Sequence, residues 1–416
     1  MNHRLRKESK WEIAKYAYQN SSFYSRIAEE NHIDTENLHN MDWESIPVIH
    51  KGMLFGRVDS LITNEYIVRD YMEELISLFT SGTTGTCLNI KWAKENADKS
   101  LSCLWWKRYH EFGIHANDRY CYFFNARNLE WKGIRYDRRQ KFSLGIYSGD
   151  LTLDVMKEVY CEMLCFHPKW LLLQPSILEI ICIVKEKYNL PDIESLQYIE
   201  LTGEMTRKGL SQRAESLLGC RIRNQYGCNE AFSIAYECRS GIYHCMESNV
   251  YIEVLDENKC PVDDGVEGDI YITSLNNYAM PFIRYAIGDR GRIFHNYSCT
   301  CGKTGTVIEL TSGRSSEMIR LKGGEKISAF TFARVINIIN EQLQDVVFQY
   351  QVIQKDIDDF LISLVIDDGF SKEELIGIFF QELNEPLLEN ARFEFAFPEC
   401  IRPDERTGKV RCFMGM

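Results

Sequence analysis

Residues 76–86 read Ile76-Ser77-Leu78-Phe79-Thr80-Ser81-Gly82-Thr83-Thr84-Gly85-Thr86. The first four residues predict a strand, and the hydroxyl and glycine residues that follow predict a tight loop. Glycine lets a backbone approach a polyphosphate closely, and hydroxyl groups add hydrogen-bond donors without bulk. No Gly-Lys-Ser/Thr closes the loop, so it is not a Walker A motif. The stretch predicts a phosphate-binding loop after a strand, with an ordinary surface turn as the alternative.

The segments on either side of this loop alternate between two hydrophobic periods. Apolar residues recur near a 3.6-residue period in several stretches, which predicts helices at 10–30, 94–112, 153–166 and 175–187. Short apolar or aromatic runs predict strands at 119–124, 170–173 and 198–201. Short strands that alternate with helices are typical of α/β folds with at least one largely parallel sheet.

Two changes in pattern predict the domain organisation. After about residue 240, strand patterns at 250–254 and 269–273 are separated by Asp/Gly turns, which indicates a β-rich subdomain over about 240–312. A smaller α+β unit follows, with helices near 328–343 and 371–384 and strands near 345–353, 360–366 and 392–397. We therefore expect a large N-terminal domain over 1–312 and a small mobile lid domain over 313–416.

Composition excludes several classes of protein. The 416 residues carry 48 Lys+Arg and 60 Asp+Glu, a formal charge of −12, which argues against nucleic acid as a partner. The N-terminus has no apolar segment of the kind found in secretory signals. The most apolar run, at 170–179, is too short to span a bilayer. We expect a soluble cytoplasmic protein with no membrane partner, and its monomeric or homodimeric state stays open.

The cysteines suggest a metal site. The chain has 15 cysteines, and in a reducing compartment clustered Cys and His favour metal binding over disulfides. Cys238 and His244 form a C-x5-H pair, and Cys299 and Cys301 form a C-x-C pair. Three thiolates and one imidazole suit a closed, structural Zn²⁺ site without a catalytic role. Cys245 is a rival ligand, and the alternative is a set of unrelated thiols beside a surface histidine.

Five more stretches follow the loop: Leu201-Thr202-Gly203-Glu204, Asn224-Gln225-Tyr226-Gly227-Cys228-Asn229-Glu230, Arg284-Tyr285-Ala286-Ile287-Gly288-Asp289, Gly313-Arg314-Ser315-Ser316-Glu317-Met318-Ile319 and Pro403-Asp404-Glu405-Arg406-Thr407-Gly408-Lys409-Val410-Arg411. With the loop, they resemble in order the motifs of the acyl-adenylate-forming superfamily of acyl-CoA synthetases, peptide-synthetase adenylation domains and luciferases. The opening at 16–24 and the stretch at 281–285 are similar to the branch that contains phenylacetate-CoA ligase and the CapK capsule proteins.

The resemblance implies a nucleotide site and assigns residues to it. The residues that would contact the nucleotide are Thr80, Ser81, Gly82, Thr83, Thr84, Gly85, Gly203, Glu204, Tyr226, Gly227, Asp289 and Arg314. Within this set Tyr226 would stack on adenine and Asp289 would accept hydrogen bonds from the ribose hydroxyls. Arg314 would bind on the ribose or phosphate side. Outside the motifs, such residues are most often core aromatics, turn residues or solvated surface groups.

The resemblance also implies two catalytic residues and a hinge. Glu230 would hold Mg²⁺, because a hard cation prefers carboxylate oxygen. Lys409 would reach the α-phosphate and the substrate carboxylate, since a flexible lysine on a mobile lid can deliver a point charge. Ser316 would stand at the hinge, where relatives often carry Asp or Lys.

The chain departs from the family pattern at two further places. Thr86-Cys87 stand where many relatives carry Pro-Lys or Lys-Pro, and Lys91 is too far along the chain to take that role. Asn229 replaces the usual Thr or Ser before Glu230. An amide can still donate a hydrogen bond, so we expect retained function with altered geometry.

The resemblance implies adenylation of a small carboxylic acid by ATP and Mg²⁺, followed by acyl transfer. CoA or the phosphopantetheine of an acyl carrier protein would be the thiol acceptor. One alternative is transfer to an amine or a sugar, and another is a non-catalytic acyl or nucleotide sensor. Aromatic residues such as Tyr122 and Phe124 permit an aromatic acid, but they suit a core equally well.

Overall fold

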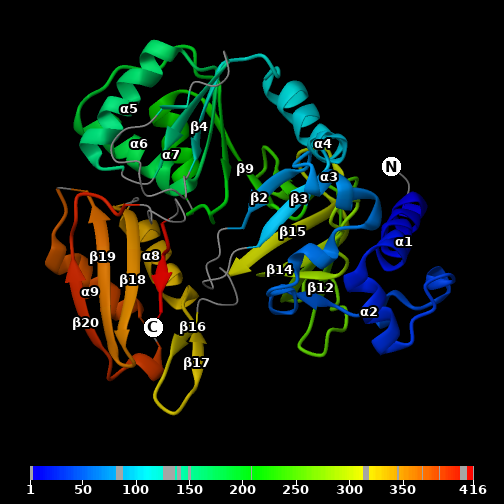
Figure 1. Ribbon diagram of the computed structural model, residues 1–416. Coiled ribbons are helices and arrows are strands. Elements are labelled where there is room, and N and C mark those ends of the chain that lie inside the picture. Colours follow the sequence, from blue (N-terminus) through cyan, green and yellow to red (C-terminus); the bar gives the residue numbers. More distant parts are fainter. Residues whose placement is uncertain are drawn as a thin grey trace. The chain divides into compact units, whose positions relative to one another are not determined.

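The computed structural model (Figure 1) describes residues 3–80, 88–124, 136–137, 142–148, 151–207, 209–312, 318–343, 346–367, 369–383, 385–402 and 410–415. The chain forms two compact units. The first unit comprises Met1–Gly113 and Gln225–Arg314, and the second comprises Ile114–Asn224 and Ser315–Met416. The mixed α/β architecture confirms the predicted fold class, including the small C-terminal α+β region.

Helices and a hairpin form the N-terminal part of the first unit. They are α1 (His3–Asn20), α2 (Ser22–Asn31), α3 (Ile67–Tyr71), β2 (Ile76–Phe79), β3 (Asn89–Trp92) and α4 (Lys94–Phe112). The prediction of one helix over 10–30 is wrong, because the chain is extended at Ser21. Ser21 makes a β-bridge with Thr63, and its hydroxyl donates to the Ser60 carbonyl at 2.9 Å. These contacts with residues far away in the sequence interrupt the helix at Ser21, although the local pattern of apolar residues predicted one continuous helix.

An antiparallel sheet forms the rest of the first unit. Its strand order is β12–β13–β14–β15–β11–β10–β9, and β1 (Ile49–His50) pairs in parallel with β14. The bounds are β9 (Arg221–Cys228), of which residues 225–228 belong to this unit, β10 (Phe232–Glu237), β11 (Tyr243–Cys245), β12 (Val250–Leu255), β13 (Gly268–Ser274), β14 (Tyr285–Ser298) and β15 (Thr304–Ser312). Apolar residues of the N-terminal helices, such as Ile13 and Phe23, share one core with Ile270 and Phe282 of the β-rich part.

A parallel sheet organises the second unit. Strands β8, β7, β4 and β6 are parallel neighbours in that order, and β5 adds an antiparallel edge. The bounds are β4 (Tyr120–Phe124), β5 (Tyr136–Asp137), β6 (Ser143–Tyr147), α5 (Leu153–Phe166), β7 (Trp170–Leu173), α6 (Pro175–Lys187), β8 (Tyr198–Thr202) and α7 (Leu210–Leu218). The helices between consecutive parallel strands provide the crossovers that such a sheet requires.

The C-terminal region of the second unit is a four-stranded sheet with two helices. Its strand order is β20–β19–β18–β21, and α8 contacts both α9 and β18 (Figure 1). The bounds are β16 (Met318–Arg320), β17 (Lys326–Ser328), α8 (Phe330–Leu343), β18 (Val347–Asp356), β19 (Asp359–Ile366), α9 (Lys372–Glu382), β20 (Arg392–Ala396) and β21 (Phe413–Met414). Its own core includes Phe332, Phe360 and Phe379.

The C-terminal region also packs on the parallel sheet of the same unit. Val365 and Ile401 join a buried cluster with Leu171 and Ile199 of that sheet. Among the described residues, no helix combines the length and the apolar character needed to cross a membrane.

Candidate functional site

A short hairpin supports the predicted phosphate loop. Strands β2 and β3 pair antiparallel, with Phe79 opposite Asn89. Beyond that pair the Thr80 N–H donates to the Leu88 carbonyl, and the Leu88 N–H donates to the Thr80 hydroxyl, both at 2.9 Å. These two bonds close the base of the loop. The loop residues Ser81, Gly82, Thr83, Thr84 and Gly85 lie outside the described residues.

The turn between β9 and β10 carries the predicted glutamate motif. Gly227 must be glycine, because a Cβ at this position would lie 1.9 Å from the Phe232 carbonyl oxygen. The neighbouring Tyr226 hydroxyl donates a 2.7 Å hydrogen bond to Asp289 Oδ2 on β14. The fold therefore joins two motif residues that are 63 positions apart in the sequence.

Glu230 lies buried in this turn. The side chains of Cys228 and Tyr285 lie near its carboxylate. Burial raises the pKa of the Glu230 carboxyl above its ordinary value, and the polar groups of Cys228 and Tyr285 and the charge of Lys51 act in the opposite direction. A buried carboxylate whose charge is partly stabilised by its neighbours in this way is suited to bind a cation. Sequence reasoning assigned no role to Cys228 or Tyr285, although both belong to the quoted motifs.

Asn229 ties the glutamate turn to the loop hairpin. Its side-chain Nδ2 donates to the Phe79 carbonyl at 2.9 Å, and its own carbonyl accepts from Trp92 Nε1 at 2.8 Å. We expected the Asn229 side chain to donate a hydrogen bond, and it donates that bond to the backbone of the hairpin. Lys91, which the sequence excludes as the cation of the loop, pairs with Asp70 at 2.7 Å. The first unit thus brings together Thr80, the glutamate turn and Asp289.

The remaining predicted nucleotide residues belong to other parts of the chain. Gly203 and Glu204 follow β8 in the second unit. Gly203 has a φ of 84°, a conformation that favours glycine. Glu204 accepts backbone hydrogen bonds from Ser176 and Val410, two partners that no sequence pattern suggested. Arg314, Ser316 and Lys409 lie outside the described residues.

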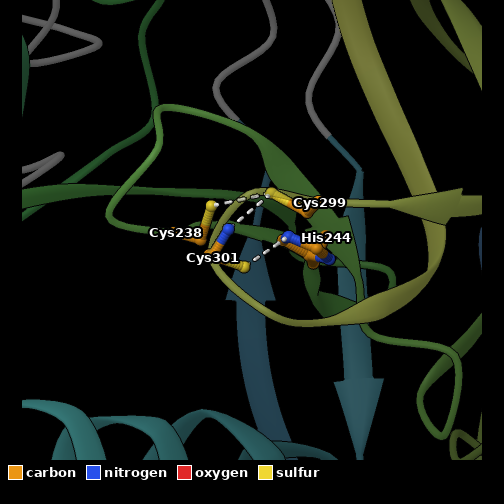
Figure 2. Close-up of side chains that lie close together, drawn as sticks. All are labelled: Cys238, His244, Cys299 and Cys301. Carbon is orange, nitrogen blue, oxygen red and sulfur yellow. Dashed lines mark hydrogen bonds between the residues drawn. The ribbon is translucent and has the colours of Figure 1, made fainter.

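The four predicted zinc ligands come together in two neighbouring β-hairpins of the first unit (Figure 2). Cys238 lies in the turn between β10 and β11, and Cys299 and Cys301 lie in the turn between β14 and β15. His244 is on β11. One ligand atom from each residue falls within 4.8 Å of the other three. The Cys238 and Cys299 sulfurs are 3.8 Å apart, and Cys301 Sγ is 3.4 Å from His244 Nε2.

The two cysteine turns have the same construction. The Cys238 N–H donates to the Ile242 carbonyl, and the Cys299 N–H donates to the Lys303 carbonyl, both at 2.9 Å. In each turn the N–H two residues on points at the first sulfur, from Ser240 at 3.4 Å and from Cys301 at 3.5 Å. Backbone N–H donors stabilise a thiolate, and the bond from Cys301 lowers the pKa of the Cys299 thiol.

Charged side chains of both signs lie near the cluster. Lys107 on α4 lies 3.2 Å from Glu111, which also pairs with Lys303. Burial first, and then the charges of Lys107 and Lys303, lower the pKa of His244. A neutral imidazole is the form that binds a metal. Cys245, the rival ligand, adjoins His244 on a strand, so its side chain projects to the opposite face and packs against the apolar core.

Two protein families match most of the chain. The AMP-binding enzyme family matches residues 68–280, and the CapK C-terminal domain matches residues 320–414. A phenylacetate-coenzyme A ligase from Thermus thermophilus is 23% identical over 98% of this chain and 87% of its own length. Protein CapK from Staphylococcus aureus is 22% identical over 96% of this chain and 86% of its own.

A solved structure shares the fold. A 2-hydroxyisobutyryl-CoA ligase in the postadenylation state, in complex with R3-HIB-AMP, superposes with a TM-score of 0.76. It is 18% identical, over 99% of this chain and 89% of that chain. The family matches and the shared fold confirm the predicted resemblance to the phenylacetate-CoA ligase and CapK branch.

Proposed function

The chain is a member of the AMP-binding enzyme family, and from that premise we propose that it is an ATP-dependent carboxylic acid ligase that forms an acyl-adenylate. The observation that carries the proposal is the assembly within the first unit. The base of the glycine-rich loop, the buried Glu230 turn and the hydrogen-bonded Tyr226–Asp289 pair lie on elements joined directly to one another. Such an assembly suits a nucleoside triphosphate and its cation.

Each group has a role set by its chemistry. The Tyr226 hydroxyl orients the Asp289 carboxylate, whose remaining acceptor capacity suits the ribose hydroxyls. Glu230 would hold Mg²⁺, which when bound neutralises part of the triphosphate charge. The buried setting of this carboxylate, near Cys228, Tyr285 and the charge of Lys51, fits such a ligand. The loop that begins at Thr80 would contact the phosphates through backbone N–H and hydroxyl groups.

We propose that residues 313–416 act as a lid that pivots near Ser316 and presents Lys409 to the reacting groups. The Lys409 ammonium would stabilise charge that develops between the carboxylate and the α-phosphate. The substrate carboxylate attacks the α-phosphorus, the bond to the β-phosphate oxygen breaks, and pyrophosphate leaves. A thiol then attacks the acyl carbon, the bond to the AMP oxygen breaks, and AMP leaves while the thiol proton passes to solvent.

The acceptor thiol would be that of CoA or of carrier-protein phosphopantetheine. The name of the Thermus relative and the CoA ligase fold both support CoA. Transfer of the acyl group to an amine or a sugar is the second candidate. A non-catalytic binding protein is the third candidate.

A panel of small carboxylic acids, scored by pyrophosphate release, tests the proposal. A ligase shows release that depends on both ATP and one acid, limited to about one turnover without an acceptor and continuous with CoA. The Glu230→Gln variant is the matched control and should lose most of this release. Continuous release with an amine or a sugar, and none with CoA, would establish the second candidate. ATP binding without any acid-dependent release would contradict catalysis.

We also propose that Cys238, His244, Cys299 and Cys301 hold one structural Zn²⁺. An ion about 2.3 Å from two sulfurs at tetrahedral angles separates them by roughly 3.8 Å. The Cys238–Cys299 separation of 3.8 Å supports this geometry. Four protein ligands leave no open position, so the ion would crosslink two hairpins and take no part in adenylation.

A further inference from the structure

The turn that carries Glu230 is held by a buried asparagine from a neighbouring turn of the first unit. Asn249 lies between β11 and β12, and its side-chain Nδ2 donates to the Ala231 carbonyl at 2.6 Å and to the Ser233 carbonyl at 2.7 Å. Asn249 is 1% exposed, and Ala231 and Ser233 are also buried. One amide group therefore holds the backbone that follows Glu230 at two points.

Other contacts fix the orientation of the Asn249 amide. Its Oδ1 accepts from Asn276 Nδ2 at 2.9 Å and from the Ser100 hydroxyl. A side-chain amide has two N–H donors and an oxygen that accepts two hydrogen bonds, so all four positions are used. Because both donors lie at the oxygen, the NH₂ group must face the two carbonyls. An aspartate at this position would place a carboxylate oxygen against two carbonyl oxygens.

The segment that Asn249 holds contains an unfavourable backbone conformation. Phe232, between Ala231 and Ser233, has a φ of 58°. This left-handed region is uncommon for a bulky side chain. Such a conformation persists only where the surrounding structure holds it, and residues of this kind cluster at functional sites. The two hydrogen bonds from Asn249 lie on either side of Phe232, so they oppose relaxation of the turn.

The loop hairpin holds the residue that precedes Glu230. The Asn229 carbonyl accepts from Trp92 Nε1 at 2.8 Å, and the Asn229 side chain donates to the Phe79 carbonyl at 2.9 Å. Together with the bonds from Asn249, these contacts fix the backbone both before and after Glu230. A buried carboxylate between two fixed points has few positions open to it, and a metal ligand needs a defined position.

We propose that Asn249 is a positioning residue that holds the Glu230 carboxylate in place for the Mg²⁺ of the nucleotide. The inference rests on the proposed ligase function, in which Glu230 is the cation ligand. Asn249 acts through the backbone of the turn, at Ala231 and Ser233. Groups behind a metal ligand orient it, and their loss typically weakens metal affinity by about 10- to 100-fold.

Binding of ATP with and without Mg²⁺ tests the proposal without reference to activity. Calorimetry gives the ATP dissociation constant in excess EDTA and in saturating Mg²⁺, and the first divided by the second measures the contribution of the metal. In Glu230→Gln this ratio should lose most of its wild-type value. Asn249→Ala should lower the ratio on the order of tenfold, with little change in the metal-free constant. Asn249→Asp should lower it at least as much, because its carboxylate repels the two carbonyls.

Asn340→Ala is the matched control. Asn340 is also a buried asparagine that holds backbone groups, since its Nδ2 donates to the Val347 carbonyl at 2.9 Å and its Oδ1 accepts from the Val347 N–H at 2.7 Å. It belongs to the second unit, whereas Glu230 belongs to the first. This variant should lower the melting temperature, as Asn249→Ala does, and leave the ratio of dissociation constants at the wild-type value.

A wild-type ratio in Asn249→Ala would overturn the proposal, and so would an equal loss of ATP affinity with and without Mg²⁺. If thermal unfolding shows that this variant does not fold, Ser100→Ala decides, because it removes one of the two donors that orient the amide. Ser100→Ala should lower the ratio in the same direction, and a wild-type ratio would overturn the proposal. Equal ratios in wild type and Glu230→Gln would refute the metal role of Glu230 on which the proposal rests. Acid-dependent pyrophosphate release by wild type decides the ligase function separately.

Discussion

The substitution Cys299→Ser is the sharpest test of the zinc proposal. It removes one sulfur of the Cys238–Cys299 pair and leaves the other three ligands and every proposed nucleotide contact in place. Serine has nearly the same shape, but its neutral hydroxyl is a poor zinc ligand. The variant should therefore lose zinc without any direct change at the adenylating residues.

The size of the effect follows from the loop that the ion closes. Cys238 and Cys299 are 61 positions apart, and a crosslink across a loop of this length stabilises a protein by about 4 kcal/mol in the chain-entropy model. The first unit contains about 200 residues, a size at which 1 kcal/mol shifts the melting temperature by about 2–4 °C. Full loss of the ion should therefore lower the melting temperature of this unit by roughly 10 °C.

Metal analysis and thermal unfolding measure the two quantities. Wild type purified without chelator should carry about one zinc per chain. Cys245→Ser should keep the metal, because that side chain packs in the core, and Cys260→Ser, at an exposed turn, should match wild type in both measurements. Adenylation by Cys299→Ser should persist well below its melting temperature. Zinc-free wild type would refute the proposal, and loss of zinc from Cys245→Ser but not from His244→Ala would refute the ligand assignment.

Three further predictions concern the adenylating residues. Lys409→Ala should severely lower pyrophosphate release while affecting thioester formation from supplied acyl-adenylate less, and equal loss in both steps would count against the proposed role. Glu230→Gln should raise the Mg²⁺ concentration needed for half-maximal adenylation, because one charged ligand is lost; an unchanged titration would contradict the assignment. Tyr226→Phe removes the donor to Asp289, so the KM for ATP should rise about fivefold, the cost of one hydrogen bond of about 1 kcal/mol, with little change in melting temperature. A KM equal to that of wild type would show that the pair does not serve the nucleotide.

Local periodicity was sufficient to predict most secondary structure. The helices expected at 153–166 and 175–187 are α5 and α6 with the same bounds, and the strand expected at 170–173 is β7. Each element is defined by side chains close together in the sequence, so its pattern is visible there. The helix expected over 10–30 was wrong because Ser21 is held extended by Thr63 and Ser60, a contact with distant residues that no local pattern reports.

The resemblance of the motifs to the family assigned Tyr226, Glu230 and Asp289 to a nucleotide and a cation, and these roles stay predictions. The contacts that support these three residues were not visible in the sequence. The approach of Cys228 and Tyr285 to Glu230, and the hydrogen bond from Asn229 to Phe79, were not predicted. They depend on how β9, β10, β14 and the loop hairpin pack, and packing is set by contacts between segments far apart in the chain.

The sequence by itself predicted the family, most element types and the four Cys and His side chains that cluster in the first unit. Only the tertiary structure decided which groups meet. Strand register placed His244 toward the three sulfurs and turned Cys245 into the core, because adjacent residues on a strand face opposite sides. Helix and sheet packing likewise brought Val410 to Glu204 across 206 positions. Such pairings form when whole faces of helices and sheets are buried against one another. No short stretch of sequence determines which faces meet.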